Sequence, residues 1–351
     1  MVVVGKSPHG GDIYTNKVKY DFSANINPLG LPKEIINEYL NCTPYLDKYP
    51  DPYCGALREA ISLKDKIPYD NIICGNGAAD IIYSYFSLFM NKKALIIGPT
   101  FLEYEQALAT NCVKFDYYLV KEENNFKLND ELINYLKNNQ YDLIIICNPN
   151  NPTGVLTHNK LLLEILKLNI NLFIDECFMD FVKDNDNYSL NRYLNKYPNL
   201  FILKAFTKIY AMAGIRLGYG LTSNKETLKQ MSSTTQAWNV SVVAQRCGVV
   251  ACTLNDYIIK SLDYIEEQRN YLMNNLTLLG FKCYESHVNF IFFKGPKELD
   301  TKLKEKGILI RNCSNYISLD ISKDYSYYRI AVRREEENKE LIKMVKEIIH
   351  G

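Results

Sequence analysis

Residues 142–154 carry the clearest signal of the fold: Asp142-Leu-Ile-Ile-Ile-Cys147, followed by Asn148-Pro-Asn-Asn-Pro-Thr-Gly154. The first six residues predict a buried β-strand, because a short apolar run that ends in turn residues is typical of a parallel strand covered on both faces. The second segment predicts a rigid turn at the carboxyl end of that strand. Open α/β sheets bind ligands at this edge, although a turn alone identifies no ligand.

Short β-rich runs alternate with amphipathic patterns on both sides of this segment, from about residue 70 to residue 220. This alternation predicts βαβ units, and therefore a mostly parallel sheet with helices on both faces. The predicted strands are residues 94–98, 113–120, 143–147, 172–175, 200–204 and 217–220. The predicted helices between them are residues 78–90, 102–109, 130–137 and 159–168.

The remainder of the chain predicts a second, smaller α+β domain. Two long helices are expected at residues 237–254 and 256–279, and the second of them would bridge the domains. Three strands (288–294, 308–311 and 328–332) and a final helix (335–349) follow. We expect a large domain over residues 46–255 and a small domain formed by residues 1–45, with an N-terminal arm, and residues 256–351.

Composition argues for a small-molecule partner. The chain has 41 Lys and Arg against 40 Asp and Glu, a net charge of +1, so no strong field would attract nucleic acid or a membrane surface. The apolar run at the start is too short for a signal peptide, and no run is long enough to span a membrane. The ten cysteines and four histidines are scattered without ligand spacing, which predicts no metal site. We expect a cytoplasmic protein.

A single lysine stands out in Phe206-Thr-Lys-Ile-Tyr-Ala-Met-Ala-Gly-Ile-Arg-Leu-Gly-Tyr219. Lys208 follows a hydroxyl residue just past a predicted strand, and Arg216 comes eight residues later. A nucleophilic lysine must be partly neutral, which nearby positive charge or burial favours. Arg216 could supply that charge and also clamp a phosphate. A lysine at a strand end is also common on a solvated surface.

Three other segments combine polar and aromatic groups at predicted strand ends. Asp175 ends a buried strand, where a carboxylate needs a cation such as a protonated pyridinium, or else caps the next turn. The Gly-rich turn before Ala78 suits a phosphate; it also resembles a weak dinucleotide-binding fingerprint, but no ribose-binding acid follows at the right distance. Phe101, in Pro99-Thr-Phe-Leu-Glu-Tyr104, could stack on a flat cofactor or belong to the core.

Taken in order, these motifs resemble those of the fold-type I pyridoxal 5′-phosphate (PLP) enzymes of the class I/II aminotransferase family, over essentially the whole chain. Within it they resemble the branch of histidinol-phosphate aminotransferases and threonine-phosphate decarboxylases. The resemblance implies an α/β fold with a large PLP-binding domain, a mostly parallel sheet flanked by helices, and a smaller α+β domain. It also implies that Lys208 binds PLP as a Schiff base, Asp175 pairs with the pyridine nitrogen, Asn151 contacts the ring hydroxyl and Phe101 stacks on the ring.

The same resemblance assigns the remaining cofactor contacts. The backbone amides of Ala78 and Ala79, together with Thr207 and Arg216, would hold the cofactor phosphate. Tyr49, in Lys48-Tyr-Pro-Asp-Pro52, would reach the phosphate bound by the neighbouring subunit, which implies a homodimer. Two positions depart from the family pattern. Phe178 replaces a tyrosine that contacts the cofactor, and Ala205 replaces a hydroxyl residue three positions before the lysine.

Three segments resemble those of threonine-phosphate decarboxylases: His9-Gly-Gly-Asp12, Asp21-Phe-Ser-Ala-Asn-Ile-Asn-Pro-Leu-Gly30 and Gly307-Ile-Leu-Ile-Arg-Asn-Cys-Ser-Asn315. Charged and polar groups could surround a phosphorylated amino acid. The candidates are His9, Asn25, Arg311, Arg329 and Arg333, with Arg329 matching the family's carboxylate-binding arginine. His9 could instead belong to a frayed terminus, and Arg333 to the surface start of a helix.

The reaction implied first is decarboxylation of L-threonine O-3-phosphate, a step of cobalamin biosynthesis, and the alternative is histidinol-phosphate transamination in histidine biosynthesis. The two reactions differ in which Cα bond stands perpendicular to the cofactor ring, which the sequence does not resolve. A non-catalytic PLP sensor of the transcription-regulator kind is a third possibility. The short segment before Ala78 lacks a basic helix-turn-helix pattern, which argues against a sensor.

Overall fold

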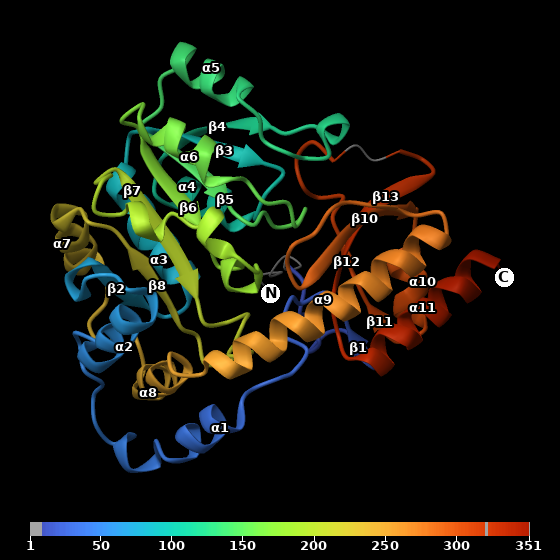
Figure 1. Cartoon of the computed structure of the whole chain (residues 1–351), viewed down its shortest axis with the longest axis horizontal. Coiled ribbons are helices and arrows are strands. Elements are labelled where there is room, and N and C mark those ends of the chain that lie inside the picture. Colours follow the sequence, from blue (N-terminus) through green and yellow to red (C-terminus); the bar gives the residue numbers. More distant parts are fainter. Residues whose placement is uncertain (1–8, 320–321, 351) are drawn as a thin grey trace, which may run out of the picture.

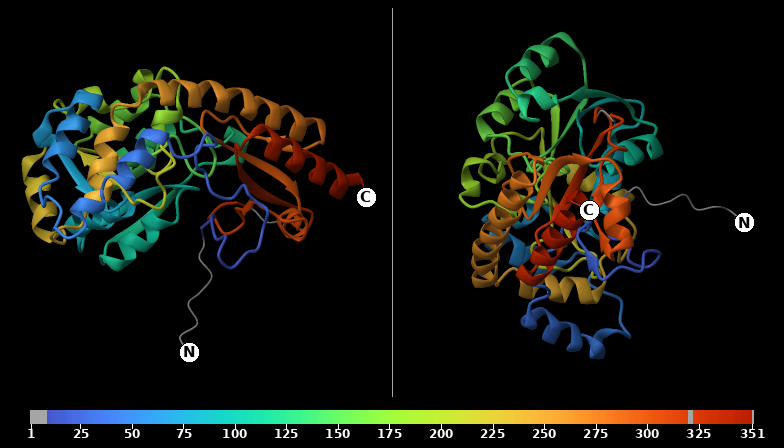
Figure 2. Two further views of the ribbon diagram at one scale, coloured as in Figure 1. Left: turned by 90° about the horizontal axis from the view of Figure 1, so that it is seen from below. Right: turned by 90° about the vertical axis from the view of Figure 1, so that its right-hand side faces the viewer.

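The computed structural model describes residues 9–319 and 322–350. Two bodies, each built around a sheet, are joined by the long helix α9 (Asn255–Leu278), which runs from one body to the other (Figure 1). Seen from below, α9 lies along one side of the molecule and extends past both sheets (Figure 2). The predicted bridging helix therefore forms almost as expected. Within the described ranges, no helix combines the length and the apolar character needed to span a membrane.

The larger body contains a seven-stranded sheet in the order β2-β8-β7-β6-β5-β3-β4. Strand β8 pairs antiparallel with both of its neighbours, and the other pairings are parallel. The prediction of an α/β fold with a mostly parallel sheet is confirmed. The strands are β2 (Ile72–Gly75), β3 (Lys93–Gly98), β4 (Lys114–Leu119), β5 (Leu143–Cys147), β6 (Asn171–Asp175), β7 (Leu200–Ala205) and β8 (Gly218–Leu221).

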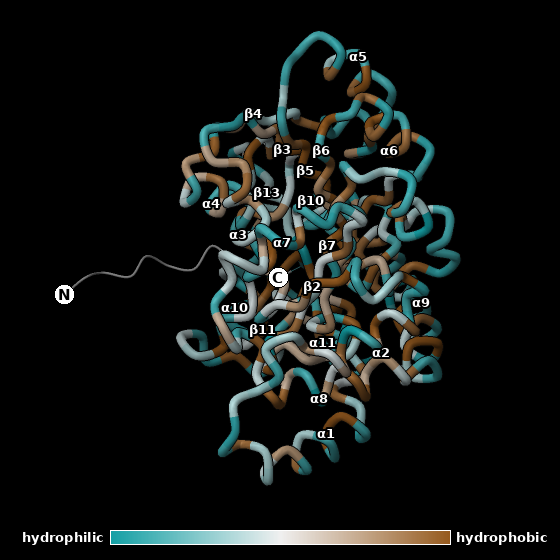
Figure 3. The backbone as a smooth tube through the Cα atoms, turned by 90° about the vertical axis from the view of Figure 1, so that its left-hand side faces the viewer, coloured by the Kyte–Doolittle hydropathy of each residue, from teal (hydrophilic) through white to brown (hydrophobic). Residues whose placement is uncertain are grey.

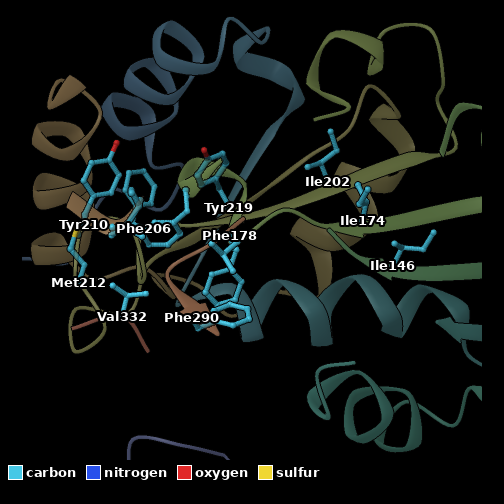
Figure 4. Packing of buried hydrophobic residues seen from close by; sticks show 14 of the residues in the cluster. Ile146, Ile174, Phe178, Ile202, Phe206, Tyr210, Met212, Tyr219, Phe290 and Val332 are labelled. Carbon is cyan, nitrogen blue, oxygen red and sulfur yellow. The ribbon is translucent and has the colours of Figure 1, made fainter. Parts of the chain in front are cut away.

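Side-chain alternation along these strands builds a core on each face of the sheet, because successive residues of a strand point to opposite faces. Ile144 and Ile146 of β5 belong to one buried cluster, which Ile174 and Ile202 continue across the sheet (Figure 4). Ile145 belongs to the other cluster. The hydrophobic positions concentrate along the central strands, and the outer loops are mostly hydrophilic (Figure 3).

Helices cover both of these faces. One cluster takes side chains from α2 (Gly55–Asp65), α5 (Glu131–Asn138), α6 (Asn159–Leu166) and α8 (Val242–Ala251). The other takes side chains from α3 (Ala78–Phe86), α4 (Glu103–Thr110) and α7 (Lys225–Thr234). This arrangement leaves the carboxyl ends of the parallel strands open to a ligand.

The smaller body contains a four-stranded antiparallel sheet in the order β12-β13-β10-β9, with α10 (Leu299–Glu305) and α11 (Glu335–His350). Its strands are β9 (Lys282–Cys283), β10 (Phe290–Pro296), β12 (Arg311–Asn312) and β13 (Tyr325–Ala331). Near it, β1 (Tyr20–Asp21) pairs in parallel with β11 (Ile308–Leu309). Helix α1 (Lys33–Leu40) packs against α8, so the N-terminal segment contacts both bodies.

Several predicted elements have different bounds in the structure. The predicted helix 237–254 is helical only as α8, because Trp238 has a φ of 56° and the Ser241 side chain caps the helix by accepting the Ala244 N–H at 3.1 Å. The predicted strand 308–311 splits into β11 and β12, which pair with different strands. The Gly-rich turn before Ala78 begins as strand β2, and the predicted helix 78–90 ends at Phe86 before a short 3₁₀ turn.

Candidate active site

A pocket of about 250 Å³ lies at the carboxyl ends of three adjacent strands. Cys147, Asp175 and Ala205, the last residues of β5, β6 and β7, line it. Lys208 follows β7 on the same edge and also lines the pocket. The smaller sheet contributes Arg329 from β13. The pocket therefore lies where the sheet topology exposes strand ends and where the two bodies meet.

Lys208 has the electrostatic surroundings of a reactive amine. Burial, assisted by the positive charges of Arg329 and Arg216, lowers the pKa of Lys208 from 10.5 to about 8. Cys177 and Asp175 oppose this shift more weakly. With a pKa of about 8, roughly a tenth of the amine is neutral at pH 7, far more than for an ordinary lysine, and the neutral form is the nucleophile.

Asp175 lies buried at the end of β6, 5% exposed. One carboxylate oxygen accepts a hydrogen bond from the Tyr104 hydroxyl at 2.5 Å, and the other accepts the Cys177 backbone N–H at 2.9 Å. Burial raises the pKa of Asp175 above its ordinary value, while these hydrogen bonds and Lys208 act against that rise. Because burial disfavours the charged form of Asp175, a cationic partner inside the pocket would stabilise the ionised carboxylate.

The start of helix α3 forms an anion cradle with Arg216. Ala78 and Ala79 open the helix and line the pocket after Gly77, which has a φ of 84°. A Cβ on Gly77 would lie 2.7 Å from a guanidinium nitrogen of Arg216, so the arginine packs directly on the glycine backbone. Thr207 lines the same pocket. Free N–H groups at a helix start, together with a guanidinium, suit a phosphate.

Asn151 and Arg329 meet across the pocket. The Arg329 guanidinium donates hydrogen bonds to Asn151 Oδ1 at 2.5 Å and to the Ser23 carbonyl at 2.7 Å. Its Nε has no hydrogen-bond partner, and it forms no ion pair with any residue in the described ranges. Burial lowers the pKa of Arg329 from its ordinary value. A buried guanidinium without a carboxylate favours an anionic ligand.

The N-terminal arm and β12 supply the remaining polar groups. His9 lies 3.0 Å from a Glu103 carboxylate oxygen, and its ring centroid is 5.3 Å from that of Phe101, which lines the pocket. Asn25 also lines the pocket; it is 3% exposed, and its Oδ1 has no hydrogen-bond partner in the described chain. Arg311 joins this wall and donates a hydrogen bond to Asn315 Oδ1 at 2.7 Å.

Two of the residues singled out from the sequence lie outside this pocket lining. Tyr49 is 79% exposed, and its ring stacks on Trp238 with the centroids 4.4 Å apart. Arg333 precedes α11 and forms an ion pair at 2.9 Å with Glu337 of the first turn of that helix. The other twelve, from His9 to Arg329, line one continuous cavity.

The structure also brings residues to this region that the sequence did not single out for a role. Tyr104 lies behind Asp175, and Tyr316 and Cys177 line the pocket. Tyr104 stands three residues after Phe101 in the same motif, a helical spacing that could have indicated a shared face. Phe178 packs edge-on against Phe290, with the ring centroids 5.1 Å apart (Figure 4), so apolar packing occupies the position of the family's tyrosine.

This donor set fits PLP, because it combines an amine of lowered pKa, a buried carboxylate that forms no ion pair with any described residue and a cradle for a phosphate. Fold and pocket together define a PLP-dependent enzyme. The sequence matches the family model for aminotransferase class I and II over residues 17–345. The chain belongs to this family, as the motifs predicted, and its cofactor is PLP.

Similar proteins carry out two reactions. The chain is 30% identical to the threonine-phosphate decarboxylase of Salmonella typhimurium, with 98% of this chain and 97% of that protein covered. It is 31% identical to histidinol-phosphate aminotransferase 1 of Carboxydothermus hydrogenoformans, with 97% and 96% covered. The crystal structure of the histidinol-phosphate aminotransferase from Clostridium acetobutylicum superimposes with a TM-score of 0.87 at 33% identity, with 94% and 99% covered.

Proposed function

We propose that this enzyme decarboxylates L-threonine O-3-phosphate. The observation that carries the proposal is a pair of arginines in the pocket. Arg311 of β12 and Arg329 of β13 line it together with residues of the N-terminal arm, and neither belongs to the anion cradle at α3. A substrate with both a carboxylate and a phosphate would engage both guanidinium groups at once. Asn25, buried and with an unpartnered oxygen, would add a polar contact on the same wall.

We assign the cofactor contacts as follows. Lys208 would bind PLP covalently, Asp175 would hold a proton on the pyridine nitrogen, Asn151 would contact the ring hydroxyl and Phe101 would stack on the ring. The phosphate would lie on the backbone of Ala78 and Ala79, with Thr207 and Arg216. When bound, PLP supplies an electron sink for the bond that breaks at Cα.

The chain's own residues would then select the bond. Arg329 and Arg311 would hold the two anionic groups of the substrate. Which arginine binds the carboxylate and which binds the phosphate would fix the orientation of Cα. Lys208 Nζ would carry the proton that Cα receives after carbon dioxide leaves. We expect His9 and Arg333 to contribute less to binding of the substrate phosphate. Each already contacts a carboxylate of the chain, His9 that of Glu103 and Arg333 that of Glu337.

The exposed aromatic surface around Tyr49 supports a homodimer. Tyr49 stacks on Trp238, and neighbouring large apolar side chains are also exposed, among them Leu40, Leu46 and Tyr53. A second copy of the chain would cover these side chains, since exposed large apolar side chains that gather in one region favour an interface. In that dimer Tyr49 would reach the cofactor phosphate of the partner subunit.

A product assay tests the reaction. The PLP-loaded protein is incubated with L-threonine O-3-phosphate in the absence of a keto acid, and carbon dioxide and aminopropanol phosphate are measured. We expect both products in equal amounts, and neither from the Lys208→Ala variant. If no product forms while histidinol phosphate and 2-oxoglutarate yield glutamate, the protein is a transaminase. The identity to a histidinol-phosphate aminotransferase makes that the second candidate.

A further inference from the structure

Glu122 joins the two bodies at a point outside the pocket. It begins a 3₁₀ turn (Glu122–Asn124) between β4 and α5, and its carboxylate accepts hydrogen bonds from three side chains of the smaller sheet region. These donors are Lys282 Nζ at 2.7 Å, the Tyr284 hydroxyl at 2.6 Å and the Tyr327 hydroxyl at 2.5 Å. Lys294 Nζ lies 3.6 Å away. Three hydrogen-bond donors and a further ammonium group, on or next to strands β9, β10 and β13, therefore surround one carboxylate.

The charge of Glu122 matches this set of partners. Partial burial alone would raise its pKa, but the hydrogen bonds from Lys282, Tyr284 and Tyr327 outweigh burial and lower the pKa to about 2. Glu122 is therefore ionised throughout the range in which enzymes work. Charge-assisted hydrogen bonds of this kind are stronger than neutral ones.

Phe126 anchors the same loop by apolar contact. Its side chain is 6% exposed and packs edge-on against Tyr284 and Phe292, with ring centroids 5.1 and 5.6 Å apart. Asn125 and Phe126 both have positive φ, of 51° and 55°. A bulky residue rarely adopts this conformation, which persists only where surrounding contacts hold it. The contacts of Glu122 and Phe126 thus fix this loop in a strained form.

The strand that Glu122 holds is the strand that carries Arg329. Tyr327 and Arg329 lie two residues apart on β13, so they share a face of the sheet. Phe292, which packs on Phe126, is the register partner of Arg329 on β10. Tyr316, of the pocket wall, belongs to the same buried cluster as Phe126 and Tyr327.

We propose that Glu122 is a positioning residue that latches β13 to the larger body and thereby fixes the distance of Arg329 from Lys208. The role in substrate binding rests on the proposed function, in which Arg329 binds an anionic group of the substrate. The latch itself rests only on the contacts of Glu122. Glutamine at position 122 keeps the shape and one acceptor oxygen, but it has no charge for Lys282 and Lys294.

The test compares Glu122→Gln with the matched control Glu123→Gln. Glu123 is the next residue of the same turn; it is exposed, and its side chain makes no hydrogen bond or ion pair with any described residue. Hydrogen–deuterium exchange of the β13 amides and steady-state kinetics with L-threonine O-3-phosphate are measured on the PLP-loaded variants. We expect Glu122→Gln to speed exchange in β13 about tenfold. We also expect it to raise KM about fivefold with kcat nearly unchanged.

Unchanged exchange in β13 of a folded Glu122→Gln protein would overturn the latch. Faster exchange with an unchanged KM would overturn the positioning role, as would the same effects in Glu123→Gln. If the wild-type protein does not turn over L-threonine O-3-phosphate, the proposed function fails, and the exchange comparison alone decides the latch. Tyr327→Phe, which removes one donor but leaves the others, should give a smaller change in the same direction.

Discussion

Replacing Lys208 with methionine should stabilise the cofactor-free protein at neutral pH. Burial and the charge of Arg329 lower the pKa of Lys208 from 10.5 to about 8. Because one pKa unit corresponds to about 1.36 kcal/mol, the protonated lysine costs the folded state up to roughly 3 kcal/mol. Lys208 is partly exposed to the pocket, and solvent screening reduces this cost. We therefore expect the free energy of unfolding to rise by about 1–3 kcal/mol.

The stabilisation should depend on pH in one direction. Below pH 8 the lysine is protonated in both the folded and the unfolded protein, so the wild-type protein bears the full cost. Between pH 8 and 10.5 the folded state releases the proton while the unfolded state keeps it, so the wild-type protein gains stability and the difference shrinks.

Urea unfolding followed by circular dichroism, at about pH 7 and about pH 10, measures this difference. Lys160→Met, at an exposed position of α6, serves as the control for the loss of a lysine. A Lys208→Met protein that is no more stable than the wild type at pH 7 would refute the reasoning. A difference that does not fall as the pH rises would refute it as well.

Three further substitutions test the cofactor contacts. Asp175→Asn should retain PLP but lower kcat by about 10²–10³-fold, since it removes a fixed charge at the electron sink; unchanged turnover would argue against that role. Tyr104→Phe removes the hydroxyl that donates to Asp175 and should lower kcat about tenfold at a nearly constant KM. The control Tyr117→Phe loses a similar hydrogen bond, to Glu105, and should leave kcat unchanged. Tyr49→Phe should speed the loss of PLP on dilution, measured by absorbance, and equal retention would speak against a shared site.

The central strands of the large sheet, β3, β5, β6 and β7, could be predicted because they are short, mostly apolar runs. Strand β5 has the predicted bounds, and β6 begins one residue earlier than predicted. The errors lie where local conformation overrides composition. An apolar sequence near Trp238 favoured a helix, but a left-handed residue and the Ser241 cap delay its start. Strand β2 was missed because it is a short edge strand that runs into glycine.

The site residues that stand at or just after the end of a predicted strand could be predicted from the sequence. Lys208 and Asp175 lie at strand ends, so the topology of the sheet brings them together. Contacts between distant segments gave no such signal. Tyr104 meets Asp175 across 71 residues, and Glu122 meets Tyr327 across 205. Pairings of this kind depend on how distant segments of the chain pack against one another, which local sequence patterns do not encode.

The fate of the hydrogen on Cα tests the central claim most directly. The PLP-loaded protein is given L-threonine O-3-phosphate that carries deuterium at Cα, in ordinary water, and the products are analysed by mass spectrometry. Decarboxylation breaks the bond to the carboxylate, so the account predicts that carbon dioxide is released and that the aminopropanol phosphate keeps its deuterium. Loss of the deuterium to water without carbon dioxide would show that the enzyme breaks the Cα–H bond instead, and would contradict the account.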